Sequence, residues 1–120
     1  MAYILISDDS ISMRQMLLFT LMEADHKVIE ACDGLSALEL AKKHLFDLII
    51  TDINMPQLDG LSLVSKLRAL PNYQYKPILL ITTETDPEKK KMAKEAGATG
   101  WIVKPFNPDK LLAAVNRVLR

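Results

Sequence analysis

The side chains best suited to chemistry in this 120-residue chain are acids, a hydroxyl and an ammonium group, each following a short apolar run. They are Asp8, Asp9, Asp52, Thr82 and Lys104. Carboxylates that share a pocket repel, and two of them ~4–5 Å apart cost about 3–4 kcal/mol at an effective dielectric of ~20. Lys104 would supply one compensating positive charge, and a divalent cation would supply two more.

The candidate metal ligands in this set are all oxygens, which favours Mg²⁺, or Mn²⁺ in its place, over zinc. Magnesium typically keeps several waters and takes one or two carboxylates together with a phosphoryl oxygen. The residue types therefore predict a site for phosphoryl chemistry, with an aspartate available as the nucleophile.

These side chains act together only if the elements that carry them end at one place. Short apolar runs predict strands at Tyr3–Ile6, Val28–Cys32, Leu48–Ile50, Ile78–Ile81 and Trp101–Val103. An unbroken apolar run such as the third one suits the middle of a parallel sheet that is covered on both faces.

Segments of helical periodicity separate the strands, and they begin near Ile11, Leu35, Leu61, Pro87 and Pro108. Ser10 and Asp86 are suited to cap the first and fourth helices, and Gly97 ends the fourth. The first helix is expected to bury the apolar members of one face, Ile11, Leu18, Leu21 and Met22. The second helix is marked by Leu35, Leu38, Ala41 and Leu45.

Strands that alternate with helices predict a single α/β domain over residues 1–120, with a doubly wound, five-stranded parallel sheet and five helices. The chain is too short for an eight-stranded barrel. Ligands of open α/β sheets bind outside the carboxyl ends of the strands. The acids, Thr82 and Lys104 follow four different strands, so we expect them to converge at that edge.

Composition and charge exclude several classes of function. Fifteen basic and fifteen acidic residues cancel, which argues against nucleic acid or a membrane surface as a partner. The balance conceals an asymmetry, −6 over residues 1–60 and +6 over residues 61–120. The first residues are not expected to act as a signal peptide, and no apolar run is long enough to span a bilayer. The single cysteine, Cys32, cannot form an internal disulfide and is expected to be a small buried hydrophobe. We expect a cytoplasmic monomer or weak oligomer.

The order and intervals of the motifs resemble those of a response-regulator receiver domain over essentially the whole chain. The motifs are Asp8-Asp9, Asp52-Ile53-Asn54-Met55-Pro56 with Asp59-Gly60, Thr82, and Lys104-Pro105-Phe106. The stretches TTETDPEKK and GATGWIVKPFNP are similar to stand-alone chemotaxis regulators of the CheY type. This resemblance implies the strand order 2-1-3-4-5.

The resemblance also implies a regulator rather than an enzyme, with Mg²⁺-dependent self-phosphorylation and self-dephosphorylation chemistry. Asp52 would accept a phosphoryl group from a CheA-type histidine kinase. Asp9 and Asp52 would hold Mg²⁺ directly together with the backbone carbonyl of Asn54, while Asp8 would act largely through water.

Further positions take roles from the same resemblance. Lys104, Thr82 and Thr83 would contact the phosphoryl group or control access to it. Asn54 and Glu84 would tune its lifetime, and the Lys104-Pro105 bond is a candidate cis peptide. Trp101 stands at an aromatic switch position, although half-buried packing explains a lone tryptophan equally well. Phosphorylation would alter the surface of the fourth helix, fifth strand and fifth helix.

Several outputs remain open from the sequence. The phosphorylated protein would bind a protein target such as the flagellar motor switch, serve a non-flagellar chemosensory pathway, or act as a phosphate sink, and a phosphatase is a further candidate partner. Ser7, Thr83 and Trp101 depart from the usual pattern and put motor binding in doubt. A small aspartate-nucleophile phosphatase is the alternative from another class, but Asn54 stands where such enzymes need a second acid. A flavodoxin-like carrier is disfavoured because Asp8 and Asp9 would repel a flavin phosphate.

Overall fold

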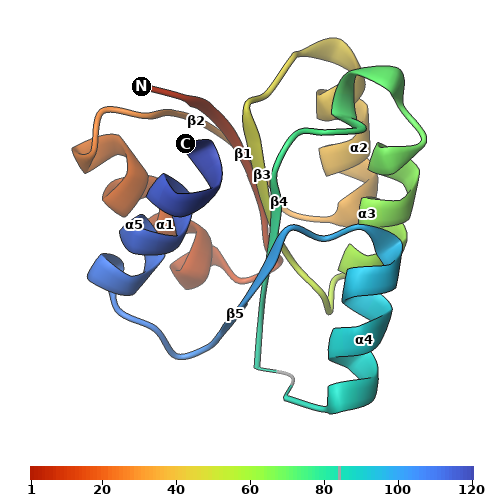
Figure 1. The fold of residues 1–120 in the computed structure, drawn as a ribbon. Helices are drawn as coiled ribbons and strands as arrows, with labels where there is room; N and C mark the ends of the chain where they lie inside the picture. The colour runs from red at the N-terminus through yellow and green to blue at the C-terminus, as the bar shows by residue number, and fades with distance from the viewer. Residues whose placement is uncertain (84) are drawn as a thin grey trace.

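Five parallel strands form one sheet in the order β2-β1-β3-β4-β5 in the computed structural model, which describes residues 1–83 and 85–120 (Figure 1). The strands are β1 (Tyr3–Ser7), β2 (Lys27–Ala31), β3 (Leu48–Asp52), β4 (Ile78–Thr82) and β5 (Gly100–Val103). The predicted fold class and strand order are confirmed. Every connection in this order is a crossover, because neighbouring strands run parallel.

Helices cover both faces of the sheet (Figure 1). They are α1 (Ile11–Glu23), α2 (Gly34–Lys43), α3 (Gly60–Arg68), α4 (Pro87–Ala96) and α5 (Pro108–Leu119), with a short 3₁₀ turn at Pro71–Tyr73. The first and fifth helices lie on one face, and α2, α3 and α4 lie on the other. Among the described residues, no helix combines the length and apolar character that crossing a membrane requires.

The two apolar cores follow from the alternation of side chains along the strands. Ile4 and Ile6 point into the core beneath α1 and α5, whereas Leu5 points into the core beneath α2 and α3. Every residue of β3 and β4 is buried, which explains the unbroken apolar runs Leu48–Ile50 and Ile78–Ile81 within them.

Polar side chains begin each of the five α-helices by accepting a hydrogen bond from a backbone N–H of the first turn. The capping residues are Ser10, Asp33, Asp59, Asp86 and Asn107. Gly97 ends α4 with a φ of 105°, a conformation that glycine adopts without a steric cost. The predicted caps of α1 and α4 and the predicted end of α4 are confirmed.

The prediction of which face α1 buries was partly wrong. Ile11 and Met22 are 65% and 57% exposed, and the buried residues are Leu17, Thr20 and Leu21. Apolar residues are spread around this helix, so its periodicity did not single out one stripe. Packing against the sheet selects the stripe through Leu17 and Leu21.

Three further expectations near β2 and α2 were wrong. Cys32 is exposed, and α2 ends at Lys43, so Leu45 lies beyond the helix that it was expected to mark. Strand β2 runs from Lys27 to Ala31, one residue earlier than predicted, and lies at an edge of the sheet. An edge strand has a neighbour on one side alone, so the residues at its end are less covered.

The buried hydroxyl of Tyr73 joins the 3₁₀ turn to the end of α2. It accepts a hydrogen bond from the backbone N–H of Phe46 at 3.2 Å. Its own proton has two carbonyl acceptors, Ala41 at 2.8 Å and His44 at 2.6 Å. Burial raises the pKa of Tyr73, which keeps this proton in place.

We expect Tyr73→Phe to lower the free energy of unfolding by about 1–3 kcal/mol, because it leaves a buried N–H and carbonyl without their partner. Urea unfolding measures this change. Tyr75 is 93% exposed, so Tyr75→Phe is a matched control that should leave stability unchanged. Equal stabilities for the two variants would contradict the role assigned to the Tyr73 hydroxyl.

Candidate functional site

Two carboxylates and one ammonium group meet at the carboxyl edge of the sheet. The Nζ atom of Lys104 lies 3.1 Å from Oδ2 of Asp8 and 3.2 Å from Oδ2 of Asp52. Asp8 is fully buried, and the side chain of Asp52 is 10% exposed. The predicted convergence of these three side chains, which come from three strand ends, is confirmed.

Asp9 completes an acidic cluster with Asp8 and Asp52. Each of the three offers a carboxylate oxygen, and these oxygens lie within 4.8 Å of one another. Asp9 is exposed and therefore opens the cluster to solvent. Hard oxygen donors at this spacing fit a small divalent cation such as Mg²⁺.

Short hydrogen bonds hold the two buried acids in place. Oδ1 of Asp8 accepts from the backbone N–H of Ser10 at 2.8 Å, at the start of α1. Oδ1 of Asp52 accepts from the N–H of Ile53 at 2.8 Å. Each acid therefore keeps one oxygen on the backbone and turns the other towards Lys104.

Arg14 also supports this site, a role that the sequence did not reveal. Its guanidinium donates to the backbone carbonyl of Asp8 at 2.7 Å and pairs with Glu30 at 3.3 Å. A lone basic residue in the helix that follows an acidic pair is the signal that could have indicated this contact.

The loop after β3 approaches Asp52 closely at Gly60. A Cβ atom at Gly60 would lie 2.1 Å from the carbonyl oxygen of Asp52, so no side chain fits there. The N–H of Gly60 donates to the carbonyl of Ile53 at 2.7 Å. The glycine of the Asp59-Gly60 motif thus lets the start of α3 pack against the strand end that carries Asp52.

The electrostatic balance of the site is unfavourable for charge on Asp52. Burial, and then the negative charge of Asp8, raise the pKa of Asp52, while Lys104 opposes the rise. Burial alone would lower the pKa of Lys104, but its contacts with Asp8 and Asp52 outweigh burial and raise it. Lys104 therefore stays protonated, and two acids compete for its single charge.

Thr82 and Lys104 are joined at the ends of β4 and β5. The backbone N–H of Lys104 donates to the carbonyl of Thr82 at 2.8 Å. Thr82 is buried, and Thr83 is exposed. Asn54 is also exposed. Glu84 lies outside the described residues.

Trp101 lies half-buried on β5, against the core beneath α2 and α3, to which α4 also contributes Ala93. It lines a hollow of about 290 Å³ together with Lys90, Ala93 and Lys94 of α4.

The Lys104-Pro105 peptide bond is cis, as predicted. A larger hollow of about 810 Å³ lies at the opposite edge of the sheet. Two charged residues in its wall, Lys76 and Asp47, form an ion pair with each other.

The sequence matches the family model of the response regulator receiver domain over residues 4–116. The chain belongs to this family. A receiver accounts for the acidic cluster, the lysine and the strand order as parts of one regulatory module, and not as the catalytic centre of a conventional enzyme.

Similar proteins place this receiver among the chemotaxis regulators. It is 40% identical to a chemotaxis protein CheY homolog of Campylobacter jejuni, covering 97% of this chain and 91% of that protein. A crystal structure of Vibrio cholerae CheY4 is 52% identical, with a TM-score of 0.96 over 99% of both chains. The receiver domain of the Pseudomonas aeruginosa histidine kinase PA1611 is 25% identical to this chain, with a TM-score of 0.92 over 98% of this chain and 97% of that one. That structure has a magnesium ion coordinated in its active-site cleft.

We expect Asp52→Asn to be more stable than the unmodified protein at neutral pH when divalent cations are chelated. The raised pKa of Asp52 means that the folded protein holds this proton more tightly than the unfolded chain does. The stability from protonated Asp52 is present at low pH and is lost as the pH rises through the folded pKa. Asparagine does not titrate, so the difference between the two proteins should vanish at acid pH.

Urea unfolding in a chelator, repeated across acid and neutral pH, measures this difference. Asp25→Asn is a control for loss of one exposed carboxyl, at a φ of 67° that asparagine tolerates. If the stability difference between Asp52→Asn and the unmodified protein did not change with pH, the charge on Asp52 would not destabilise the folded protein.

Proposed function

We propose that residues 1–120 form a phosphorylation switch in which Asp52 accepts a phosphoryl group from a phosphohistidine of a CheA-type kinase. The observation that carries this proposal is the placement of Asp52 beside Asp8, Asp9 and Lys104. The membership of the chain in the receiver family supports the same role and implies a histidine kinase upstream and a protein target downstream.

Mg²⁺ is the cation proposed for the acidic cluster, with Mn²⁺ as a substitute, and it would neutralise charge on the carboxylates and on phosphoryl oxygens. Asp9, Asp52 and the backbone carbonyl of Asn54 would hold it directly. Asp8, which is fully buried, would act largely through water. The magnesium ion in the similar PA1611 receiver supports this choice.

Phosphoryl transfer to Asp52 is a displacement at phosphorus. A carboxylate oxygen of Asp52 forms the new P–O bond, the P–N bond to the donor imidazole breaks, and the electron pair of that bond leaves with the imidazole. The ammonium of Lys104, which lies 3.2 Å from the carboxylate, would pair with oxygens of the incoming group. Water would later hydrolyse the acyl phosphate, with Asn54 and Glu84 tuning the rate.

The phosphoryl group would then act as a switch through β4 and β5. It adds acceptor oxygens at the strand edge where Thr82 ends β4, and Thr83 beside it would control access to the site. Movement of Thr82 towards the phosphoryl group would make room for Trp101 to move. This local change would alter the surface formed by α4, β5 and α5.

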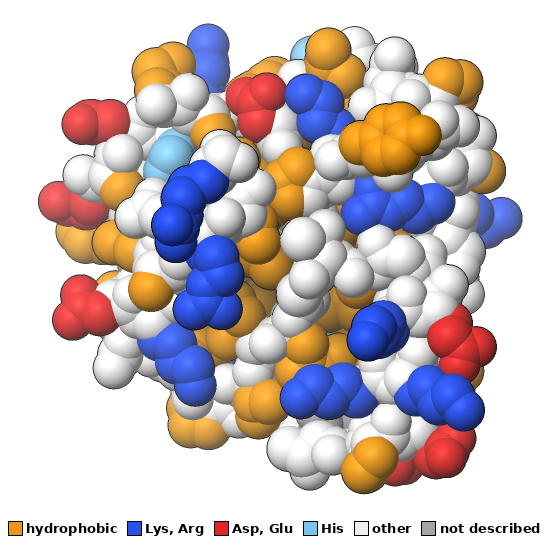
Figure 2. All heavy atoms as spheres, in the orientation of Figure 1, with side chains coloured by type: hydrophobic (Ala, Val, Ile, Leu, Met, Phe, Trp, Pro, Cys, Tyr) orange, Lys and Arg blue, Asp and Glu red, His pale blue; other side chains and the backbone are white. Residues whose placement is uncertain are grey.

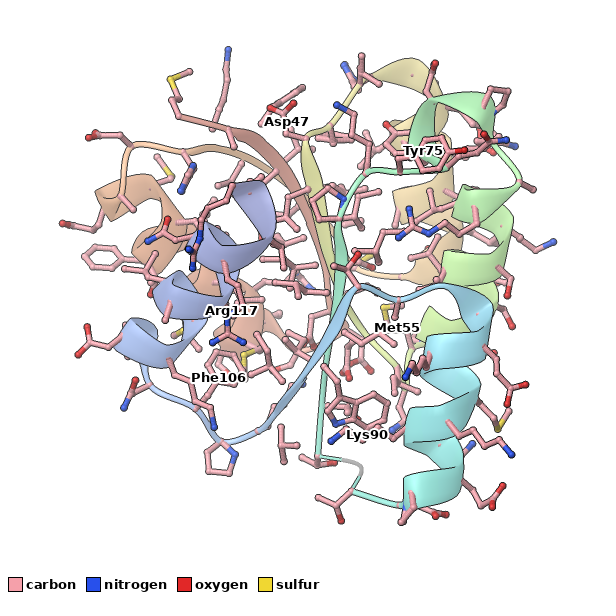
Figure 3. All side chains as sticks on the ribbon, in the orientation of Figure 1. Asp47, Met55, Tyr75, Lys90, Phe106 and Arg117 are labelled. Carbon is pink, nitrogen blue, oxygen red and sulfur yellow. The ribbon has the colours of Figure 1, made fainter. Side chains whose placement is uncertain are left out.

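The surface of α4, β5 and α5 is proposed to bind the downstream protein. Figure 2 shows Lys and Arg side chains spread over this face, and Figure 3 labels Lys90 of α4 and Arg117 of α5. Within α4, Ala93 is the buried residue, so this helix is anchored weakly and suited to movement.

The similarity to CheY proteins favours a chemotaxis output such as the flagellar motor switch. A phosphate sink and a non-flagellar chemosensory pathway are the alternative outputs, and a phosphatase that removes the phosphoryl group is a further proposed partner. We propose that the protein works as a cytoplasmic monomer, without nucleic acid or membrane as a partner.

Incubation with Mg²⁺ and a small phosphodonor, followed by intact mass measurement, tests the proposed phosphoacceptor. We expect a single phosphoryl adduct that is lost in Asp52→Asn and kept in the control Asp25→Asn. The adduct should also require the divalent cation. Steady turnover of many phosphoesters without an adduct would instead indicate an aspartate-nucleophile phosphatase.

We also expect the fluorescence of Trp101, the single tryptophan of the chain, to change when beryllium fluoride and Mg²⁺ mimic the phosphoryl group. The physical reason is a change in the half-buried surroundings of its ring when β4 and β5 rearrange. Isothermal titration calorimetry establishes that the mimic is bound. An unchanged emission spectrum with the mimic bound would rule out a switch role for Trp101.

A further inference from the structure

Two buried hydroxyl groups lie side by side directly beneath the acidic cluster. Ser7 and Thr51 are register partners on β1 and β3, and both are fully buried. Each immediately precedes an acid of the site, Asp8 or Asp52. Because side chains alternate along a strand, both hydroxyls face the core beneath α2 and α3.

The thioether sulfur of Met55 is an acceptor that these two hydroxyls share. It lies 3.1 Å from Oγ of Ser7 and 3.7 Å from Oγ1 of Thr51. Figure 3 shows Met55 on the side of the sheet that α3 and α4 cover. Met55 thus belongs to the loop after β3 but is bonded to the sheet.

The two hydroxyls differ in how much they depend on the sulfur, because each has one proton to donate. Thr51 has a better acceptor in the carbonyl of Asp52 at 3.0 Å. For Ser7 the alternative acceptor is the carbonyl of Asp33, at a longer 3.4 Å. The contact between Ser7 and Met55 is therefore the main hydrogen bond to the sulfur.

This contact connects the two halves of the proposed cation site. Ser7 is covalently bonded to Asp8, and Asp8 leads directly to Asp9. Met55 is covalently bonded to Asn54, whose carbonyl is the proposed backbone ligand. We propose that the Ser7–Met55 hydrogen bond is a positioning brace that holds the Asn54 carbonyl in register with the carboxylates of β1.

The inference rests on the proposed function, because a brace for a cation site matters only if the site binds a cation. Neither side chain is a proposed ligand of the cation or of the phosphoryl group, so both are positioning residues. The sulfur is a weak acceptor, but its donor is fully buried, where water does not replace a lost bond. Met55 also packs against the apolar core, so a leucine retains most of its packing while removing the acceptor.

The test compares Ser7→Ala, Met55→Leu and the double variant with the unmodified protein. Titration calorimetry measures the dissociation constant for Mg²⁺, and hydrogen exchange measures protection of the Asn54 and Met55 amides without any cation. Ser65→Ala and Met92→Leu are matched controls, because both residues are exposed on helices away from the contact. Thermal unfolding of each variant reports any general loss of stability.

We expect each single variant to bind Mg²⁺ about two- to tenfold more weakly, the range for loss of one neutral hydrogen bond. The double variant should be no weaker than the weaker single variant, since both changes remove the same bond. The loop amides should exchange faster in all three variants and remain unchanged in both controls.

Unchanged Mg²⁺ affinity in both single variants would overturn the brace while leaving the proposed function intact. Additive losses in the double variant would also overturn it, because they would show two independent effects. Reduced thermal stability with unaltered affinity would assign the contact to folding alone. If the unmodified protein bound no Mg²⁺, the proposed function would fail and the brace with it.

Discussion

One ammonium group between two buried carboxylates is the interaction on which the rest of this site depends. Lys104 contacts both Asp8 and Asp52, yet it supplies one positive charge against two negative charges. Asp9, close by and exposed, adds a third acid. The folded protein therefore holds an excess of negative charge at one strand edge, which a bound cation or neutralisation of Asp52 would reduce.

The order of the strands makes this crowding possible. The strands β1 and β3 are adjacent in the centre of the sheet, so the acids that follow them lie next to each other. The strand β5 lies at an edge, beyond β4, and the long side chain of Lys104 reaches back across to both acids. Helices on both faces bury the strands, and the same burial raises the pKa of Asp52. Burial of the strands by the helices therefore shapes both the fold and the pKa of Asp52.

The site and the candidate output surface share the β4–β5 pair. The backbone N–H of Lys104 donates to the carbonyl of Thr82, so a displacement of Lys104 would reach the ends of both strands. Trp101 lies on β5, between the core and the hollow beside α4. On the opposite side of the site, Ser7 and Met55 link β1 to the loop after β3. Contacts between β1 and the loop after β3 thus flank the acidic cluster on one side, and Lys104, which follows β5, flanks it on the other.

The sequence by itself determined the kinds of groups at the site and the strand ends that carry them, because apolar runs and the polar residues after them are local patterns. It also determined the caps Ser10 and Asp86 and the end of α4 at Gly97, which depend on neighbouring residues alone. Only the tertiary structure decided that Leu17, and not Ile11, faces the core, that Cys32 is exposed, and that Arg14, Ser7 and Met55 support the acids. Those outcomes depend on helix rotation, edge position and contacts between distant segments, which packing settles and local patterns do not encode.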